Sequence, residues 1–186
     1  NACAMDLFDN ITELQIAEVV NQWKSLGLLH KYVQQGKSLD ELIKYCLTFI
    51  TAGEGLGYNR ALFFEYNPDN RYFQFKQAIG HITRKENDQT LHNLKNKPLN
   101  FEDLLKMAPE IKDQEINTIM RDFIIDANSQ PLWKVLQDDE AKIINLQSQT
   151  KYCKLPIIQE LRERIGFSYY IVIRVPGAYT PLGCLL

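Results

Sequence analysis

A glycine-rich stretch in the first third of the chain marks a change from helical to extended periodicity. Three glycines fall within residues 53–57, and glycine readily takes the positive φ that ends a helix and turns the backbone. Before them, apolar residues recur at helical spacing over 39–50, and Ser38 with Glu41 has the spacing of a capping box. After them, 60–66 is an apolar, aromatic run that favours a strand. The sequence therefore predicts a helix, a turn and a buried strand in that order.

A second strand is predicted directly after the first. Residues 67–70 read Asn-Pro-Asp-Asn, which is typical of a tight turn, and 71–80 returns as a β-favouring segment. The order helix, glycine turn, strand starting at Asn59-Arg60-Ala61, turn, and strand ending in Ala78-Ile79-Gly80 resembles the opening of a GAF domain. The resemblance is to GAF domains of bacterial signal-transduction proteins, in particular those of sensor histidine kinases. It covers the chain from about Leu39 to Leu186.

The resemblance implies an α+β fold in which a central antiparallel sheet carries helices on both faces. Helices are expected over 12–30, 39–50, a helical insertion at about 82–136, and 156–165. Strands are expected over 60–66, 71–80, 141–146, 167–175 and 181–186. The first two helices would cover one face of the sheet, and the insertion and the last helix the other.

The same resemblance suggests how the chain is divided. Residues 1–37 would form an N-terminal helical segment, and 38–186 the GAF-like domain. Asn1 and Ala2 have the character of a tag remnant. A complete GAF domain would continue past Leu186 into a long helix, so we expect the C-terminal part of the domain to be truncated or missing.

Within the insertion, a longer helix is predicted to begin near Pro109, because proline suits a first helical turn. Its apolar stripe has helical spacing: Ile111, Ile116, Ile119, Met120, Phe123 and Ile124. Thr83 and Glu86 repeat the capping-box spacing at the start of the insertion. Gly166 is placed to end the helix at 156–165.

Composition excludes several classes of protein. The chain has 186 residues, which fits one domain of ordinary size, and a formal net charge of −2 with no basic stripe, so nucleic-acid binding is not expected. Four widely spaced cysteines without a secretory signal favour free thiols in the cytoplasm. No apolar run approaches the ~20 residues that span a bilayer, so direct membrane insertion is not expected.

Motifs for phosphate, metal and chromophore binding do not fit. The glycines lie between a helix and a following strand, whereas phosphate loops lead from a strand into a helix. The three histidines have no metal-site spacing, so we expect no metal. Bilin-binding GAF relatives carry their attachment cysteine near the position of Cys153, but Lys154 stands where those relatives have histidine. The Asn-Lys-x-Asp signature of cyclic-nucleotide GAF domains is absent, and the sequence leaves the cofactor unknown.

The function implied by the resemblance is sensory. GAF domains bind small molecules or dimerise, and they regulate a fused effector such as a histidine kinase or a cyclase. No nucleophile elbow or acid–base pair is visible, so we expect no catalytic residues and no enzyme activity in this domain. Two alternatives stay open: a dimerisation module without ligand, and an enzyme like the GAF-fold methionine sulfoxide reductases, although the cysteine spacing gives no clear match to it.

A ligand site is expected between one sheet face and the helices that cross it, as in GAF-like folds. Its walls would be Phe64, Phe75, Ile144, Tyr152, Cys153, Ile157, Tyr170 and Ile173. These side chains are aromatic and aliphatic with few polar atoms, which suits a flat, apolar or heteroaromatic molecule. In an ideal strand Tyr170 and Ile173 point to opposite faces, so both line the site only if a register shift or a bulge intervenes. The alternative to a pocket is a side-chain-filled core.

A homodimer is also expected. Ile16, Val20 and Trp23 have helical spacing within the first helix and form an apolar stripe that a small domain need not cover. In GAF proteins such a leading helix often pairs with its copy in a second subunit. The alternative is that the stripe packs on its own domain.

Overall fold

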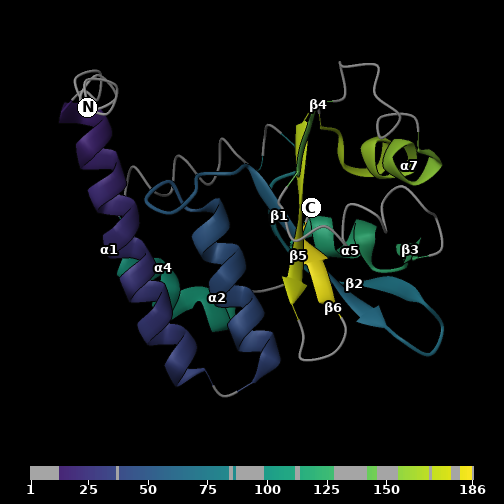
Figure 1. The fold of residues 1–186 in the computed structure, drawn as a ribbon, viewed down its shortest axis with the longest axis horizontal. Coiled ribbons are helices and arrows are strands. Elements are labelled where there is room, and N and C mark those ends of the chain that lie inside the picture. Colours follow the sequence, from purple (N-terminus) through teal and green to yellow (C-terminus); the bar gives the residue numbers. More distant parts are fainter. Residues whose placement is uncertain are drawn as a thin grey trace, which may run out of the picture. The chain divides into compact units, whose positions relative to one another are not determined.

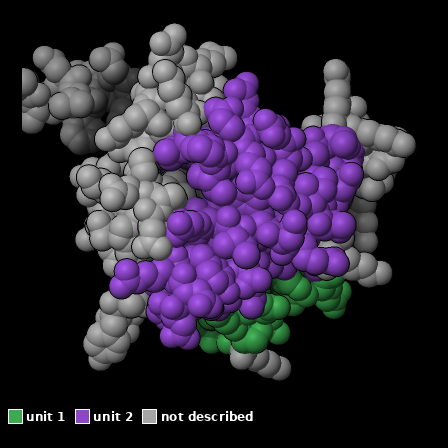
Figure 2. Space-filling view, turned by 90° about the vertical axis from the view of Figure 1, so that its right-hand side faces the viewer, with its two compact units in different colours: residues 1–58, 99–110 green, residues 59–98, 111–186 purple. Residues whose placement is uncertain are grey.

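In the computed structural model, the chain divides into two compact units. The structure describes residues 13–36, 38–83, 86, 99–111, 114–127, 142–145, 155–167, 169–176 and 181–185 (Figure 1). One unit, the helical unit, comprises 1–58 and 99–110, and the other, the sheet unit, comprises 59–98 and 111–186 (Figure 2).

In its described residues, the helical unit contains three α-helices and a short 3-10 helix. They are α1 (Glu13–Gln35), α2 (Leu39–Thr51), α4 (Phe101–Met107) and η1 (Ala108–Glu110). The sequence predicted α2 within one residue at its end, and its N-cap is as expected, since the Ser38 hydroxyl accepts a hydrogen bond from the Glu41 amide at 3.2 Å. Helix α1 runs five residues past the predicted end at His30, because Gly27 is accommodated inside the helix.

Apolar and aromatic contacts hold the helical unit together. Leu47 of α2 and Phe101 and Leu105 of α4 are fully buried, and the Phe49 and Phe101 rings meet edge to face with centroids 6.0 Å apart. The Lys44 ammonium adds a hydrogen bond of 3.1 Å to the Pro109 carbonyl oxygen. Helices α2 and α4 with η1 thus share one buried surface.

The glycine stretch forms the predicted turn at the end of α2. The Leu56 amide donates to the Phe49 carbonyl at 3.0 Å and the Tyr58 amide to the Ile50 carbonyl at 2.9 Å, so the last turn's carbonyl groups find partners. Gly57 has a φ of 68°. A Cβ on Gly55 would lie 1.9 Å from the Phe49 carbonyl oxygen, so no larger residue fits there.

Where the chain is described, the sheet unit is built on a six-stranded antiparallel sheet, and the predicted α+β class is confirmed. The strands are β1 (Arg60–Asn67), β2 (Tyr72–Gly80), β3 (Ile124–Asp126), β4 (Lys142–Asn145), β5 (Tyr169–Pro176) and β6 (Pro181–Leu185). Their order across the sheet is β3-β2-β1-β6-β5-β4. Strand β1 is therefore central, with β2 on one side and β6, paired through Phe63–Glu65 with Gly183–Leu185, on the other.

A β-bulge in the β1–β2 ladder decides which residues face the core. The register shifts between Phe63 and Phe64, and Lys76 is the extra residue of β2. Because the bulge takes up one position, Phe75 and Ala78 both belong to the same buried cluster although they are three positions apart, which in a regular strand places side chains on opposite faces. The predicted turn joins the two strands, and the Asn67 side-chain oxygen accepts from the amides of the two residues after Pro68 at 3.0 and 3.2 Å.

The predicted long helix from Pro109 to Ile124 is wrong. Helix α5 spans only Glu115–Met120, and Ile124–Asp126 forms the edge strand β3. The reason lies in β2, whose outer edge needs hydrogen-bond partners: the Phe75 amide donates to the Phe123 carbonyl at 3.1 Å, and β3 pairs beyond it.

Two amide side chains of α5 and its N-cap continue this pairing where β3 stops. Asn117 is buried, and its side chain accepts from the Ala78 amide at 2.8 Å and donates to the Ala78 carbonyl at 3.1 Å. The Gln114 side chain accepts from the Gly80 amide at 2.9 Å. These side-chain amides supply the hydrogen bonds that a neighbouring strand would make, so the backbone of β2 at Ala78 and Gly80 has partners on its outer edge.

Candidate ligand site

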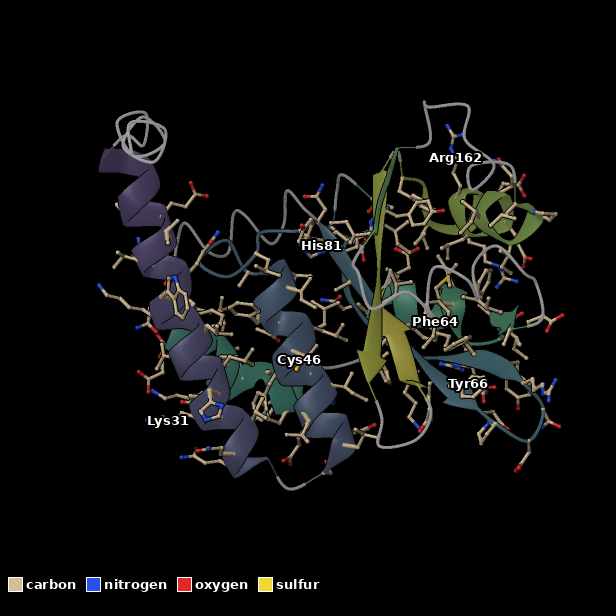
Figure 3. All side chains as sticks on the ribbon, viewed as in Figure 1. Lys31, Cys46, Phe64, Tyr66, His81 and Arg162 are labelled. Carbon is tan, nitrogen blue, oxygen red and sulfur yellow. The ribbon has the colours of Figure 1, made fainter. Side chains whose placement is uncertain are left out.

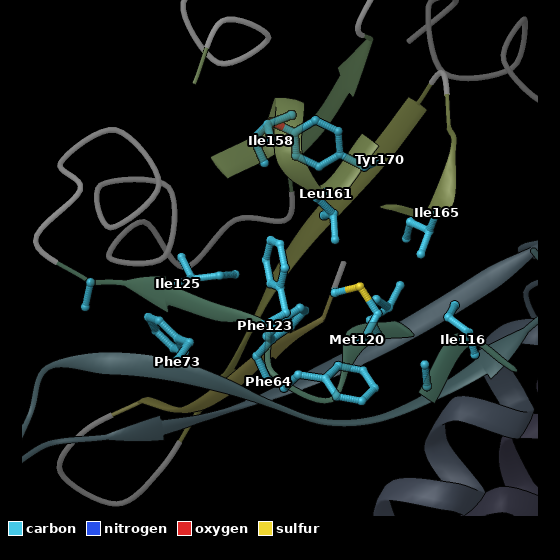
Figure 4. Packing of buried hydrophobic residues seen from close by; sticks show 14 residues of the cluster. Phe64, Phe73, Ile116, Met120, Phe123, Ile125, Ile158, Leu161, Ile165 and Tyr170 are labelled. Atoms are coloured by element: carbon cyan, nitrogen blue, oxygen red, sulfur yellow. The ribbon is translucent and has the colours of Figure 1, made fainter. Parts of the chain in front are cut away.

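One apolar cluster fills the face of the sheet that α7 (Pro156–Ile165) covers (Figure 4). Its buried members are Leu62, Phe64, Phe73, Phe75, Ala78, Ile116, Met120, Phe123, Ile125, Ala127, Ile158, Leu161, Ile165 and Tyr170. They come from β1, β2, α5, β3, α7 and β5 and from the residues directly before and after β3. The predicted bounds of α7 are confirmed, with Pro156 in the first turn and Gly166 as C-cap at a φ of 59°.

Four of the eight predicted site residues meet in this cluster. Phe64 and Phe75 oppose each other in the β1–β2 ladder, and their rings are edge to face with centroids 5.8 Å apart. Tyr170 of β5 is buried, and Ile157 of α7 is half-buried and packs against the cluster. The side chains thus converge from segments that are far apart in the sequence. Figure 3 labels Phe64 on β1.

The other four predicted residues are placed less completely. Ile144 lies in β4 opposite Tyr170, and Ile173 lies in β5 opposite Leu185, but their side chains are outside the described part of the structure. Tyr152 and Cys153 fall outside the described residues altogether. Their role in a site stays a prediction.

Phe123 is the principal core residue that sequence reasoning misplaced. Its ring lies 6.1 Å from that of Phe64 between centroids, and it is fully buried. The sequence put Phe123 in a helical stripe, whereas the chain leaves α5 at Arg121 and presents Phe123 just before β3. No signal near Phe123 separates the two outcomes, because its burial depends on the open edge of β2.

Arg164 links α7 to the segment that follows α5. Its guanidinium lies over the Phe123 ring, 5.0 Å from the centroid, and donates to the Asp122 carboxylate at 2.7 Å and the Glu160 carboxylate at 2.9 Å. A further bond of 3.1 Å reaches the Ile119 carbonyl. The Arg164 hydrogen bond is the main reason that the pKa of Asp122 is lowered.

Arg60 also binds the C-terminal end of α7. Its guanidinium donates to the carbonyl oxygens of His81 at 2.5 Å, Ile82 at 3.3 Å and Ile165 at 2.5 Å, and also to that of Gly166. The last carbonyl groups of a helix lack intrahelical partners and carry partial negative charge, so a cation is favoured there. Burial lowers the pKa of Arg60, and the nearby Glu86 carboxylate opposes that effect.

The predicted capping box of Thr83 and Glu86 is present next to Arg60. The Glu86 carboxylate accepts from the Ile82 amide at 2.9 Å and from the Thr83 amide at 3.1 Å, while the Thr83 hydroxyl accepts from the Glu86 amide at 3.2 Å. The amide hydrogen bond from Thr83 is the largest cause that lowers the pKa of Glu86. Glu86 is therefore held as a carboxylate.

The described side chains offer binding surface rather than reactive groups. Burial raises the pKa of the Cys46 thiol on α2, which disfavours the reactive thiolate. Among the residues whose placement is described, no group of three or more histidine, cysteine or acidic side chains could hold a metal ion. Within the same residues, no helix combines the length and apolarity that a membrane crossing requires.

Comparisons with known proteins identify no family for this chain. No family model and no curated protein sequence matches it. Among solved structures, one that is similar is described as "Crystal structure of a methyl-accepting chemotaxis protein, residues 122 to 287". The TM-score is 0.49 at 12% identity, and the match covers 85% of this chain and 76% of the other. A likeness of this strength identifies no family.

Proposed function

We propose that the chain is a sensory module of a bacterial signalling protein. It binds a flat, apolar or heteroaromatic molecule between the β1–β2–β5 face and α7, and it relays binding in the cytoplasm to a fused effector such as a histidine kinase. In this proposal the module performs no catalysis itself. The observation that carries it is the convergence of Phe64, Phe75, Ile157 and Tyr170 in one apolar cluster.

The way α7 is held favours entry from one side. Arg60 and Arg164 both bind at the C-terminal end of the helix, where their guanidinium groups donate seven hydrogen bonds. At the other end, Leu155 and Ile157 pack against the cluster through partly buried apolar side chains, and among the described residues no side-chain capping hydrogen bond is present there. In this proposal a small molecule reaches the Phe64–Phe75 rings by displacing the N-terminal end of α7.

Binding of indole and quinoline, followed by amide chemical shifts in NMR, tests this proposal. We expect saturable shifts in β1, β2, β5 and α7. Ile157→Trp adds volume beside the cluster and is expected to weaken binding at least tenfold, whereas Ile124→Trp, at an exposed site on β3, leaves it unchanged. Shifts that do not saturate, or equal effects of the two variants, would remove the ligand site.

A dimerisation module is the second candidate, and the surface of α1 favours it. Four large apolar side chains at helical spacing are exposed there: Val19 by 50%, Val20 by 45%, Trp23 by 71% and Leu26 by 46%. A contiguous apolar patch of this kind marks an interaction surface in soluble proteins. We propose that a second copy of α1 covers it, as in most symmetric dimers. The two candidates are compatible, since they use different elements.

A further inference from the structure

Gly27 leaves a gap in the exposed apolar stripe of α1, which consists of Val19, Val20, Trp23 and Leu26. Gly27 is itself exposed, and outside its chain neighbours no side chain lies within 4 Å of the position that a Cβ would take. It follows Trp23 by four residues, so the two lie on the same face of the helix, about one turn apart. A large projecting ring, exposed by 71%, therefore stands next to bare backbone.

The ring and the gap fit one another when two α1 helices run antiparallel. A two-fold axis at the level of Ser25, midway between Trp23 and Gly27, sets each Trp23 against the partner's Gly27. Helices interdigitate best when a large side chain faces a small one. A parallel pair in register instead sets the two Trp23 rings against each other and the two glycines against each other. The rings then hold the helices apart where the glycines leave a void, which costs packing.

The charges along α1 favour the same direction. Glu13 and Glu18 lie in the first two turns, Lys24 lies at the midpoint and Lys31 lies near the end. Antiparallel pairing brings the acidic end of one helix alongside the basic end of the other, with the axes about 8–10 Å apart, whereas parallel pairing brings like ends together. Salt screens charges over about 8 Å, so this contribution selects the direction of pairing more than it strengthens the pair.

We propose that two copies of the chain pair through antiparallel α1 helices, with the Trp23 ring of each packed on the partner's Gly27. This inference rests on the dimerisation proposed above and adds the direction of the helices and the central contact. Val19, Val20 and Leu26 extend the apolar contact on both sides of that centre. The alternative is a parallel pair, which covers the same apolar side chains without the fit between ring and glycine.

A double-mutant cycle, read as the dimer Kd from sedimentation equilibrium, tests the central contact. Gly27→Leu occupies the gap and is expected to raise the Kd at least tenfold, although leucine adds apolar surface and favours a helix more than glycine does. Trp23→Leu removes the ring and is also expected to raise the Kd at least tenfold. The double variant sets leucine against leucine in both contacts and is expected to have a Kd within threefold of that of the unchanged protein.

Asn21→Leu is the matched control for Gly27→Leu. Asn21 is exposed on α1 and lies two residues from Trp23, so its side chain faces away from the stripe. The same leucine at this position is expected to change the Kd less than twofold.

The sign of the Gly27→Leu effect separates the two directions of pairing. In a parallel pair the leucines fill the void between the glycines and lower the Kd. A Kd that Gly27→Leu lowers or leaves unchanged, or a double variant that does not recover, overturns the antiparallel contact and leaves the dimer itself standing. A monomer of the unchanged protein at all concentrations overturns the dimer, and the contact with it.

Cross-linking of the unchanged protein reads the direction of pairing without any substitution. In an antiparallel pair centred at Ser25, the two copies of Lys24 differ by about 3 Å in level along the axis and the two copies of Lys31 by about 18 Å, at ~1.5 Å per residue. Both lysines are exposed, and mixing chains labelled with 14N and 15N identifies links between copies. With a short amine-reactive cross-linker, we expect at least five times more Lys24–Lys24 than Lys31–Lys31 links. Equal yields at the two positions, or no link at Lys24, overturn the proposal.

Discussion

Gly80 shows how one residue fixes the end of the central ladder. Its φ is +141°, and a Cβ would lie 2.7 Å from both the Arg60 Cγ and the Asn59 carbonyl oxygen. Gly80→Ala therefore combines a disfavoured backbone conformation with steric overlap against the Asn59 backbone and the base of the Arg60 side chain. We expect it to lower the free energy of unfolding by about 2–4 kcal/mol, measured by urea denaturation.

Gly53 provides the matched control for this substitution. It has no positive φ, and no atom lies within 4 Å of its missing Cβ. Gly53→Ala is expected to change the free energy of unfolding by less than about 1 kcal/mol, in the stabilising direction, because alanine restricts the unfolded chain. Equal losses at residues 53 and 80 would contradict the steric argument.

Helix α5 acts on the sheet through one buried amide. Asn117 meets both the amide and the carbonyl of Ala78, so its removal leaves two buried backbone groups unpaired. We expect Asn117→Leu to lower the free energy of unfolding by about 2–4 kcal/mol in urea denaturation, since each unpaired buried group costs roughly 1–3 kcal/mol. Thr118→Ala, at the exposed next position of the same helix, should change it by less than about 0.5 kcal/mol. A small effect at Asn117 would mean that water replaces its amide.

Elements with their own end signals could be predicted from the sequence. Helix α2 carries Ser38 at its N-cap, and α7 has Pro156 in its first turn and Gly166 beyond its last. Strand β3 carries no such signal. Ile124 fits the predicted helical stripe as well as it fits a strand, and Ile124–Asp126 becomes a strand because β2 presents an unpaired edge to it.

The candidate site was predictable to the extent that local pattern determines it. Two aromatic strands joined by a tight turn predict that Phe64 and Phe75 lie on neighbouring strands. The register of the ladder then places them opposite each other. The bulge at Lys76, the amide pairing of Asn117 and the burial of Phe123 did not follow. The burial of Phe123 and the pairing of Asn117 depend on contacts between segments tens of residues apart, and the bulge depends on the exact register of β1 with β2; sequence spacing encodes neither.

For the whole molecule, the exposed stripe on α1 predicts self-association. We expect light scattering to give the mass of a dimer at high protein concentration, because pairing removes Trp23 and its apolar neighbours from water. Trp23→Asp places a charge at the centre of the stripe and should return the mass to that of a monomer. Glu18→Gln, an exposed position on the same helix outside the four apolar residues, is the control and should remain a dimer. The mass of a monomer at all protein concentrations would show that the predicted dimer does not form.

The pairing of β1 with β6 has a consequence for the order of events during synthesis. Phe63 and its partner Leu185 are more than a hundred positions apart in the chain. At about 5–20 residues per second, a ribosome releases the partner roughly 6–24 s after β1. A β1–β2 hairpin formed in that interval has the β6-facing edge of β1 unpaired. Closure of the sheet between β1 and β5 is therefore a late event that follows translation of residues 181–185.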